Sequence, residues 1–174
     1  MIFDACFCDC NNDPCLYCVA EMEARAFGTM TKSMGIKKAD FLATNNDFGL
    51  GASTAFSEML KGQGVQIGAM ETMDPKATDF SAQLAKIKAS GGDTLFVTTA
   101  VEQITLILKQ AKDQQLTARI ITTGGSNSPD QLIAQAGDAA NGSLHLVFFT
   151  PWFPEAVKNP DVAKKFVGLW NDKK

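Results

Sequence analysis

Ala-Asp-Phe-Leu-Ala-Thr-Asn-Asn-Asp-Phe-Gly-Leu-Gly, residues 39–51, is the stretch from which the fold can be predicted. An apolar run at 41–43 is followed by polar residues at 44–47, and a glycine-flanked turn at 49–51 leads into a helical pattern. This order predicts a strand, a loop and an amphipathic helix. Ligands of open α/β sheets lie beyond the carboxyl ends of the strands, so Asn46, Asp47 and Phe48 are expected at a ligand site. We expect Asp47 to cap the turn, as an N-cap or Asx turn.

The same alternation of apolar runs and helical patterns continues along the chain. Short apolar runs predict strands at 39–43, 65–70, 94–98, 119–122 and 144–149. Helical spacing predicts helices at 20–34, 51–61, 102–115, 130–136 and 161–171, and a further helix that Thr78 and Asp79 cap. Strands that alternate with helices are typical of βαβ units. The sequence therefore predicts an α/β fold, a doubly wound, mostly parallel five-stranded sheet with helices on both faces.

The composition is that of an ordinary globular domain. The chain has 174 residues, of which 45% are hydrophobic and 20% charged, and its formal net charge is -3. The basic residues are scattered, whereas nucleic-acid binding needs a clustered basic face, so no nucleic-acid partner is predicted. The sequence contains no apolar run of membrane-spanning length. No cofactor is predicted.

All five cysteines lie within the first eighteen residues, at Cys6, Cys8, Cys10, Cys15 and Cys18. Thiolates at this spacing can bind zinc or an iron–sulfur cluster, and the Cys-x-x-Cys pair can also act in redox chemistry. The favoured interpretation is a tail that is foreign to the domain. We therefore divide the chain into a cysteine-rich tail at 1–19 and a domain at 20–174. The tail shows neither the basic region nor the unbroken apolar region of a secretory signal.

Three predicted strands end in polar loops, at 45–49, 98–102 and 122–128, which should meet at one edge of the sheet. Hydroxyls, glycines and backbone N–H groups at helix starts suit a small polar or anionic ligand. The predicted ligand-binding residues are Asp47, Phe48, Thr99, Ala100, Val101, Gly124, Gly125 and Ser126.

Catalytic patterns are sparse, so the chain is not predicted to be an enzyme. The one histidine, His145, falls within a predicted strand, and the serines lack a Gly-x-Ser-x-Gly elbow. Phospho-acceptor chemistry needs paired carboxylates, and Asp47 has asparagines as neighbours. A free-standing flavodoxin-like sensor or enzymatic domain is nevertheless kept as an alternative, together with metal or redox binding by the tail.

Four segments in order resemble a known family. They are Asn-Asp-Phe-Gly-Leu-Gly at 46–51, Asp-Phe-Ser-Ala-Gln-Leu-Ala-Lys-Ile-Lys at 79–88, Ile-Leu-Lys-Gln-Ala at 107–111 and Ala-Gly-Asp-Ala-Ala-Asn-Gly at 136–142. Together they are similar to the leucine/branched-chain amino-acid type of periplasmic solute-binding protein, which has the type I fold. The resemblance covers residues 20–174 and corresponds to the second of two lobes.

The resemblance implies reversible capture of a small solute between two lobes that close by a hinge, for import by an ABC permease in the periplasm. It places second-lobe contacts at Phe48, at Ala100 and at Gly124, where an acidic residue would pair with the ammonium of an amino acid. Because a buried ammonium without a partner is costly, we expect a neutral or anionic solute, such as an organic or aromatic acid. The missing first lobe, or a second copy of the chain, would complete the cleft.

Overall fold

A computed structural model describes residues 18–123, 129–147, 154–156 and 159–173. One five-stranded sheet has the order β2-β1-β3-β4-β5, and every pair of neighbouring strands is parallel. Its strands are β1 (Lys38–Thr44), β2 (Gln66–Met73), β3 (Thr94–Thr98), β4 (Arg119–Thr122) and β5 (Leu144–His145). The predicted parallel α/β fold is confirmed. The expected bounds of β3 and β4 are also confirmed, whereas residues 148–149 of the expected last strand lie outside the described residues.

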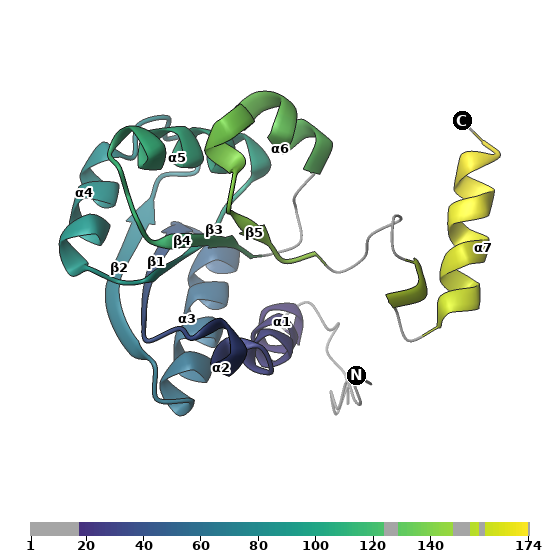
Figure 1. The fold of residues 1–174 in the computed structure, drawn as a ribbon, viewed down its shortest axis with the longest axis horizontal. Coiled ribbons are helices and arrows are strands. Elements are labelled where there is room, and N and C mark those ends of the chain that lie inside the picture. Colours follow the sequence, from purple (N-terminus) through teal and green to yellow (C-terminus); the bar gives the residue numbers. More distant parts are fainter. Residues whose placement is uncertain (1–17, 124–128, 148–153, 157–158, 174) are drawn as a thin grey trace.

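Helices cover both faces of the sheet. They are α1 (Cys18–Gly28), α2 (Thr31–Met34), α3 (Asp47–Gly62), α4 (Ser81–Ser90), α5 (Val101–Asp113), α6 (Pro129–Ala136) and α7 (Pro160–Asn171), with the short turns η1 (Gly137–Ala140) and η2 (Pro154–Ala156). In Figure 1, α4, α5 and α6 lie above the sheet, whereas α1, α2 and α3 lie below it.

Alternation along the strands divides the interior into two cores. Phe41 and Phe96 pack toward α1 and α3, whereas Leu42, Leu95 and Val97 pack toward α4 and α5. Every residue of β3 is buried, as expected of a central parallel strand that is covered on both faces. The sheet is therefore held by apolar contacts on both sides, which fixes the position of its carboxyl edge.

The helix expected at 20–34 is wrong in one respect, because it is broken into α1 and α2. A turn follows α1, in which Met30 N donates to Phe27 O at 2.8 Å. The amide of Gln63, on the residue after α3, donates to Gly28 O at 2.9 Å and satisfies a carbonyl at the end of α1. The break thus depends on a partner 35 residues away, which helical periodicity alone does not contain.

A bulge interrupts the pairing of β2 with β1. Ala39 pairs with Ile67 and Phe41 with Met70, so two residues of β2 stand opposite Asp40. A bulge of this kind leaves the extra residue without its ladder partner. β2 continues past the bulge to Met73, beyond the predicted end at residue 70.

The carboxylate of Asp40 replaces the missing ladder partner. It is fully buried, and its Oδ1 accepts from Ala69 N at 2.6 Å and from Ser90 Oγ at 2.7 Å. Its Oδ2 accepts from Gly92 N at 3.2 Å. One side chain therefore ties β1 to the bulge in β2 and to the turn after α4.

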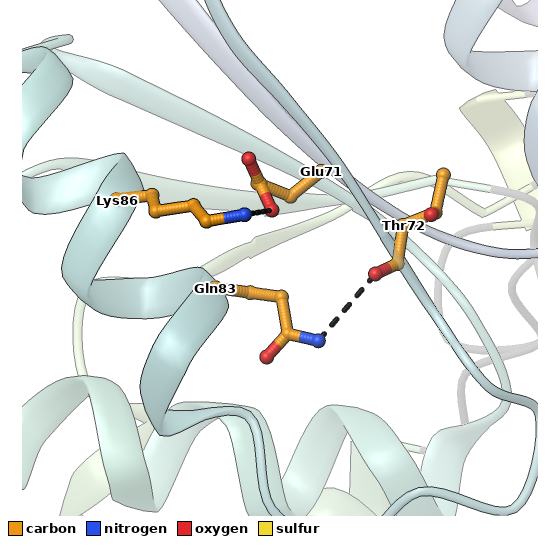
Figure 2. Close-up of polar contacts among 4 residues, drawn as sticks. All are labelled: Glu71, Thr72, Gln83 and Lys86. Carbon is orange, nitrogen blue, oxygen red and sulfur yellow. Dashed lines mark hydrogen bonds and ion pairs between the residues drawn. The ribbon is translucent and has the colours of Figure 1, made fainter.

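Side chains of α4 lie along β2, an edge strand of the sheet. Figure 2 shows Lys86 Nζ 2.9 Å from Glu71 Oε2, and Gln83 Nε2 3.5 Å from Thr72 O. The ion pair is exposed on the lysine side and contributes at most about 1 kcal/mol. The pair links α4 to the face of β2 that this helix covers.

Helix α7 stands apart from the sheet and packs against η2 (Figure 1). Its large apolar side chains are mostly exposed: Val162, Phe166, Leu169 and Trp170. Within the described ranges, no helix combines the length and the apolarity that a membrane span needs.

Candidate functional site

The strand order locates the candidate site. The chain first adds β2 on one side of β1 and then β3 on the other, so the direction of winding reverses between β1 and β3. In sheets of the order 2-1-3-4-5, ligands bind in the crevice outside the carboxyl ends of the two strands at this reversal. The segments that follow these strands here are residues 45–48 and 99–101.

The turn after β1 becomes helical earlier than predicted. Asn46 is the N-cap of α3, and its Oδ1 accepts from Gly49 N at 2.8 Å. The assignment of the cap to Asp47 is therefore wrong by one residue: Asp47 is the first helical residue, where its negative charge is favourable. The predicted helix start at residue 51 is wrong for the same reason, because an asparagine cap starts the helix ahead of the glycines.

This turn leaves Phe48 at the surface, at the start of α3. Phe48 is 47% exposed, although it belongs to the first turn of a helix that is otherwise packed on the sheet. Asp47 and Phe48 also border a groove of about 810 Å³ between α1 and α3, whose walls include Ala24, Ala52 and Met59. An exposed aromatic ring beside an apolar groove is suited to pack against a small organic molecule.

A glycine is required where α3 passes over the end of β1. A Cβ at Gly49 would lie 2.1 Å from Thr44 O, whereas a Cβ at Gly51 would meet nothing within 4 Å. We expect Gly49→Ala to lower the free energy of unfolding by about 1–3 kcal/mol. The matched Gly51→Ala variant should raise it by about 0.5–1 kcal/mol, because alanine is the better helix former. Urea unfolding of both variants measures this, and equal stabilities would contradict the close approach.

The turn after β3 combines a buried hydroxyl with an exposed small residue. Thr99 is 2% exposed, Ala100 is exposed and Val101 is half-buried. Thr44 Oγ1 donates to Thr99 Oγ1 at 2.7 Å, which joins the ends of β1 and β3 directly across the reversal. The predicted residues Asp47, Phe48 and Ala100 are thus at the surface of the carboxyl edge, whereas Thr99 lies beneath it.

The remaining predicted residues cannot be placed. Gly124, Gly125 and Ser126 lie outside the described residues, as do Cys6, Cys8, Cys10 and Cys15. Cys18 is the first residue of α1. Within the part of the chain that the structure describes, no group of three or more histidine, cysteine, aspartate or glutamate side chains is arranged to hold a metal ion.

His145 is held between two hydroxyls at the end of β5. Its Nδ1 lies 2.7 Å from Thr122 Oγ1, and its Nε2 lies 2.9 Å from Ser143 Oγ. Ser143 donates its one proton to Ala140 O at 2.7 Å, so it accepts from an Nε2–H of the ring. Burial lowers the pKa of His145 below its ordinary value of 6.5, which favours the neutral ring.

The lowered pKa of His145 predicts a loss of stability in acid. Since the folded state binds this proton less tightly than the unfolded state, the free energy of unfolding should fall as the pH drops below about 6.5. The slope stays under about 1.4 kcal/mol per pH unit, because a single histidine binds at most one more proton in the unfolded state than in the folded state. Urea unfolding at pH 7.5 and pH 5.5 should show a smaller difference for His145→Gln than for the wild type. If the free energy of unfolding changed more between the two pH values in the variant than in the wild type, the direction of the pKa shift of His145 would be contradicted.

A second hollow, of about 550 Å³, lies at the opposite end of the sheet. It is lined by residues that precede or begin β3 and β4, such as Asp93 and Arg119, and by Lys112 of α5. The carboxyl-edge crevice is the better candidate site, because ligands of open α/β sheets bind at the carboxyl ends of the strands where the winding reverses.

Sequence reasoning missed the capping role of Asn46 and the residue Gln103 at the carboxyl edge. Asn46 could have been recognised as an asparagine directly before a helical pattern. Gln103 is buried in the first turn of α5, where its amide contacts the loop that follows β2. Its one signal in the sequence is a polar residue beside Ile104 and Ile107 on the inner face of a helix.

Residues 8–173 match the family described as periplasmic binding protein. The match begins inside the segment 1–19, and the division of the chain at residue 20 stays a prediction. The leucine-, isoleucine-, valine-, threonine- and alanine-binding protein of Pseudomonas aeruginosa is 27% identical over 103 residues, which are 59% of this chain and 27% of that protein. The Leu/Ile/Val-binding protein homolog 2 of Brucella abortus is 30% identical over 132 residues, 74% of this chain and 34% of that protein.

Solved structures share the fold. A leucine-binding protein from Thermotoga maritima superposes with a TM-score of 0.77 at 28% identity, over 88% of this chain and 43% of that one. A Rhodopseudomonas palustris protein superposes with a TM-score of 0.79 at 18% identity, over 89% of this chain and 43% of that one. The chain thus spans about a third of the length of the curated relatives and less than half of these structures.

Proposed function

The chain belongs to the periplasmic binding proteins of the branched-chain amino-acid type, and on that premise we propose that it forms one wall of a solute-binding cleft. The proposed wall is the carboxyl edge of β1 and β3. Phe48 carries the proposal, because it is a half-exposed aromatic ring at the reversal of the strand order. Asp47, Ala100 and Val101 flank the ring in the proposed site, and Gly124 to Ser126 are proposed to complete it.

The proposed solute is a small organic acid with an apolar part. Relatives carry names that specify leucine, isoleucine, valine, threonine and alanine. An amino acid brings an ammonium group, which needs an acceptor when it is buried, whereas an aromatic acid does not. Phe48 suits either solute, since its ring offers an apolar face and no hydroxyl. An acidic residue in the wall would accept the ammonium of an amino acid, whereas a glycine at that place would not. Both kinds of solute are therefore included in the test.

We propose that a second wall faces this one and is supplied by the remaining part of the family fold or by a second copy of the chain. Relatives are longer than this chain by more than half of their own length. The exposed apolar side chains of α7, among them Val162 and Trp170, are consistent with a face that such a part would cover. By family, the proposed location is the periplasm and the proposed partner is an ABC permease.

Titration of the chain with L-leucine and, separately, with benzoate tests the proposal. A one-sided crevice leaves much of a ligand in water, so we expect weak binding, visible as shifts in the amide resonances of Phe48 and Ala100. Phe48→Ala should weaken the binding about tenfold, through loss of the ring contact. Met70→Ala, on the edge strand β2 and 48% exposed, is the matched control and should bind as the wild type does. If neither probe shifted the amide resonances of Phe48 and Ala100, the proposed site would be contradicted.

A further inference from the structure

The buried amide of Gln103 joins two loops of the carboxyl edge. Its Nε2 donates to Asp74 O at 3.1 Å and to Ala77 O at 3.2 Å, both in the loop between β2 and α4. Its Oε1 accepts from the hydroxyl of Thr99, in the turn after β3. A primary amide has two N–H donors and one carbonyl oxygen, so both donors and the oxygen have protein partners.

The hydrogen bonds continue from Gln103 to the end of β1. Thr44 Oγ1 donates to Thr99 Oγ1, and Thr99 in turn donates to Gln103. Each hydroxyl has a single proton, and Thr99 directs its proton to the amide. Thr44 Oγ1 lies 2.7 Å from Thr99 Oγ1 and 3.4 Å from Thr98 O, so the shorter contact takes its proton. Thr99 therefore has no proton left to donate to a solute, and it acts on the crevice through Gln103 and Thr44.

The loop between β2 and α4 is thereby held beside the crevice. Asn45 N donates to Met73 O at 2.8 Å, so the loop starts next to the turn that carries Phe48. A second glutamine of α5 fixes the far end, where Gln110 Oε1 accepts from Phe80 N at 2.7 Å and Gln110 Nε2 donates to Thr78 O at 2.8 Å. Gln103 connects the loop to the other two turns, whereas the contacts of Gln110 stay within the far end of the loop.

We propose that Gln103 is a positioning residue that fixes three loops around the crevice, so that residues 74–77 form a third side of the solute site. The assignment of residues 74–77 to the solute site rests on the proposed function of the crevice. The coupling of the three loops through Gln103 does not depend on that function. Linked hydrogen bonds of this kind strengthen one another, and losing a middle member disturbs both ends. The chain of bonds ends at Thr44, two residues before Asn46. Asn46 caps α3 and thereby sets the position of Phe48 in the first turn of this helix.

Gln103→Leu and Gln110→Leu form a matched pair for the test. Each variant removes one side-chain amide of α5 that binds the same loop, so both should lose similar stability in urea. Amide hydrogen exchange of the folded chain separates them. Gln103→Leu should exchange about tenfold faster at Ala77, Ala100 and Phe48, whereas Gln110→Leu should do so at Phe80 alone. A purely local role of Gln103 would leave Phe48 unchanged, and that result would overturn the proposal.

Gln103→Glu separates the two halves of the network. A carboxylate still accepts from Thr99 but cannot donate to the loop carbonyls, so exchange should rise at Ala77 and stay unchanged at Phe48. With L-leucine as the probe, affinity should fall about tenfold in Gln103→Leu and stay within roughly threefold in Gln110→Leu. Equal affinities of Gln103→Leu and Gln110→Leu for L-leucine would show that residues 74–77 are not part of the site. If the wild type binds no probe, the solute proposal fails, and the exchange data alone decide the role of Gln103.

Discussion

Replacing Phe96 by alanine is expected to lower the free energy of unfolding by about 3–5 kcal/mol. Phe96 lies in the centre of β3 and is 1% exposed. Its ring centroid is 5.3 Å from that of Phe27 in an edge-on arrangement, 5.3 Å from that of Phe41 in a stacked one, and 5.5 Å from that of Phe56. The variant would leave a cavity where α1, α3 and β1 meet, and no neighbouring backbone can close it without moving the sheet.

Urea unfolding followed by far-UV circular dichroism measures this loss. Phe48→Ala is the control, because it deletes the same atoms from a half-exposed position, and we expect it to cost less than about 1 kcal/mol. If both variants lost the same stability, the cluster of four rings would not be the centre of this core.

Replacing Asp40 by alanine is the second large effect that we expect. The variant would leave the donors of Ser90 and Gly92 without this acceptor, and Ala69 N would keep only its longer contact of 3.3 Å to Ser90 Oγ. Each buried donor without a partner costs about 1–3 kcal/mol, so a loss of about 3 kcal/mol or more is expected. Asp40→Asn should lose less, because one carboxyl oxygen remains as an acceptor. Asp113→Ala, on the exposed end of α5, should stay within about 0.5 kcal/mol of the wild type.

A double-mutant cycle with Gly92 isolates the contact. A Cβ at Gly92 would lie 2.2 Å from Asp40 Oδ2, so Gly92→Ala should be strongly destabilising by itself. In the Asp40→Ala background the colliding oxygen is absent, and the second substitution should cost less. Strict additivity of the two losses would show that the carboxylate and the glycine do not constrain each other.

The sequence contained enough to predict the sheet. The β-branched run of β3 and the short run of β4 have the bounds that were expected, because buried parallel strands depend mainly on their own apolar residues. The position of Phe48 was also predictable, since it follows from the strand that precedes it.

Features set by distant partners were not predictable. The break after α1 depends on Gln63, and the placement of the loop after β2 depends on Gln103. Thr99 was expected at the ligand because it directly follows β3. Its side chain is nevertheless buried, because other residues pack over it. Local pattern thus located the edge of the sheet, and long-range hydrogen bonds determined which side chains lie at its surface.

The bulge opposite Asp40 has a consequence for how β2 tolerates insertions and deletions. In an unbroken strand all odd-numbered side chains would share one face, yet Ile67 packs toward α3, whereas Ala69 and Met73 pack toward α4 and α5. The extra residue shifts the phase of the alternation between these positions. Deleting Gly68 would therefore remove the bulge and leave Ile67 and Met73 facing their own cores, because Met70 and Met73 would keep their partners on β1. The extra residue is thus a local insertion that the sheet accommodates without turning the flanking residues of β2 to the other face.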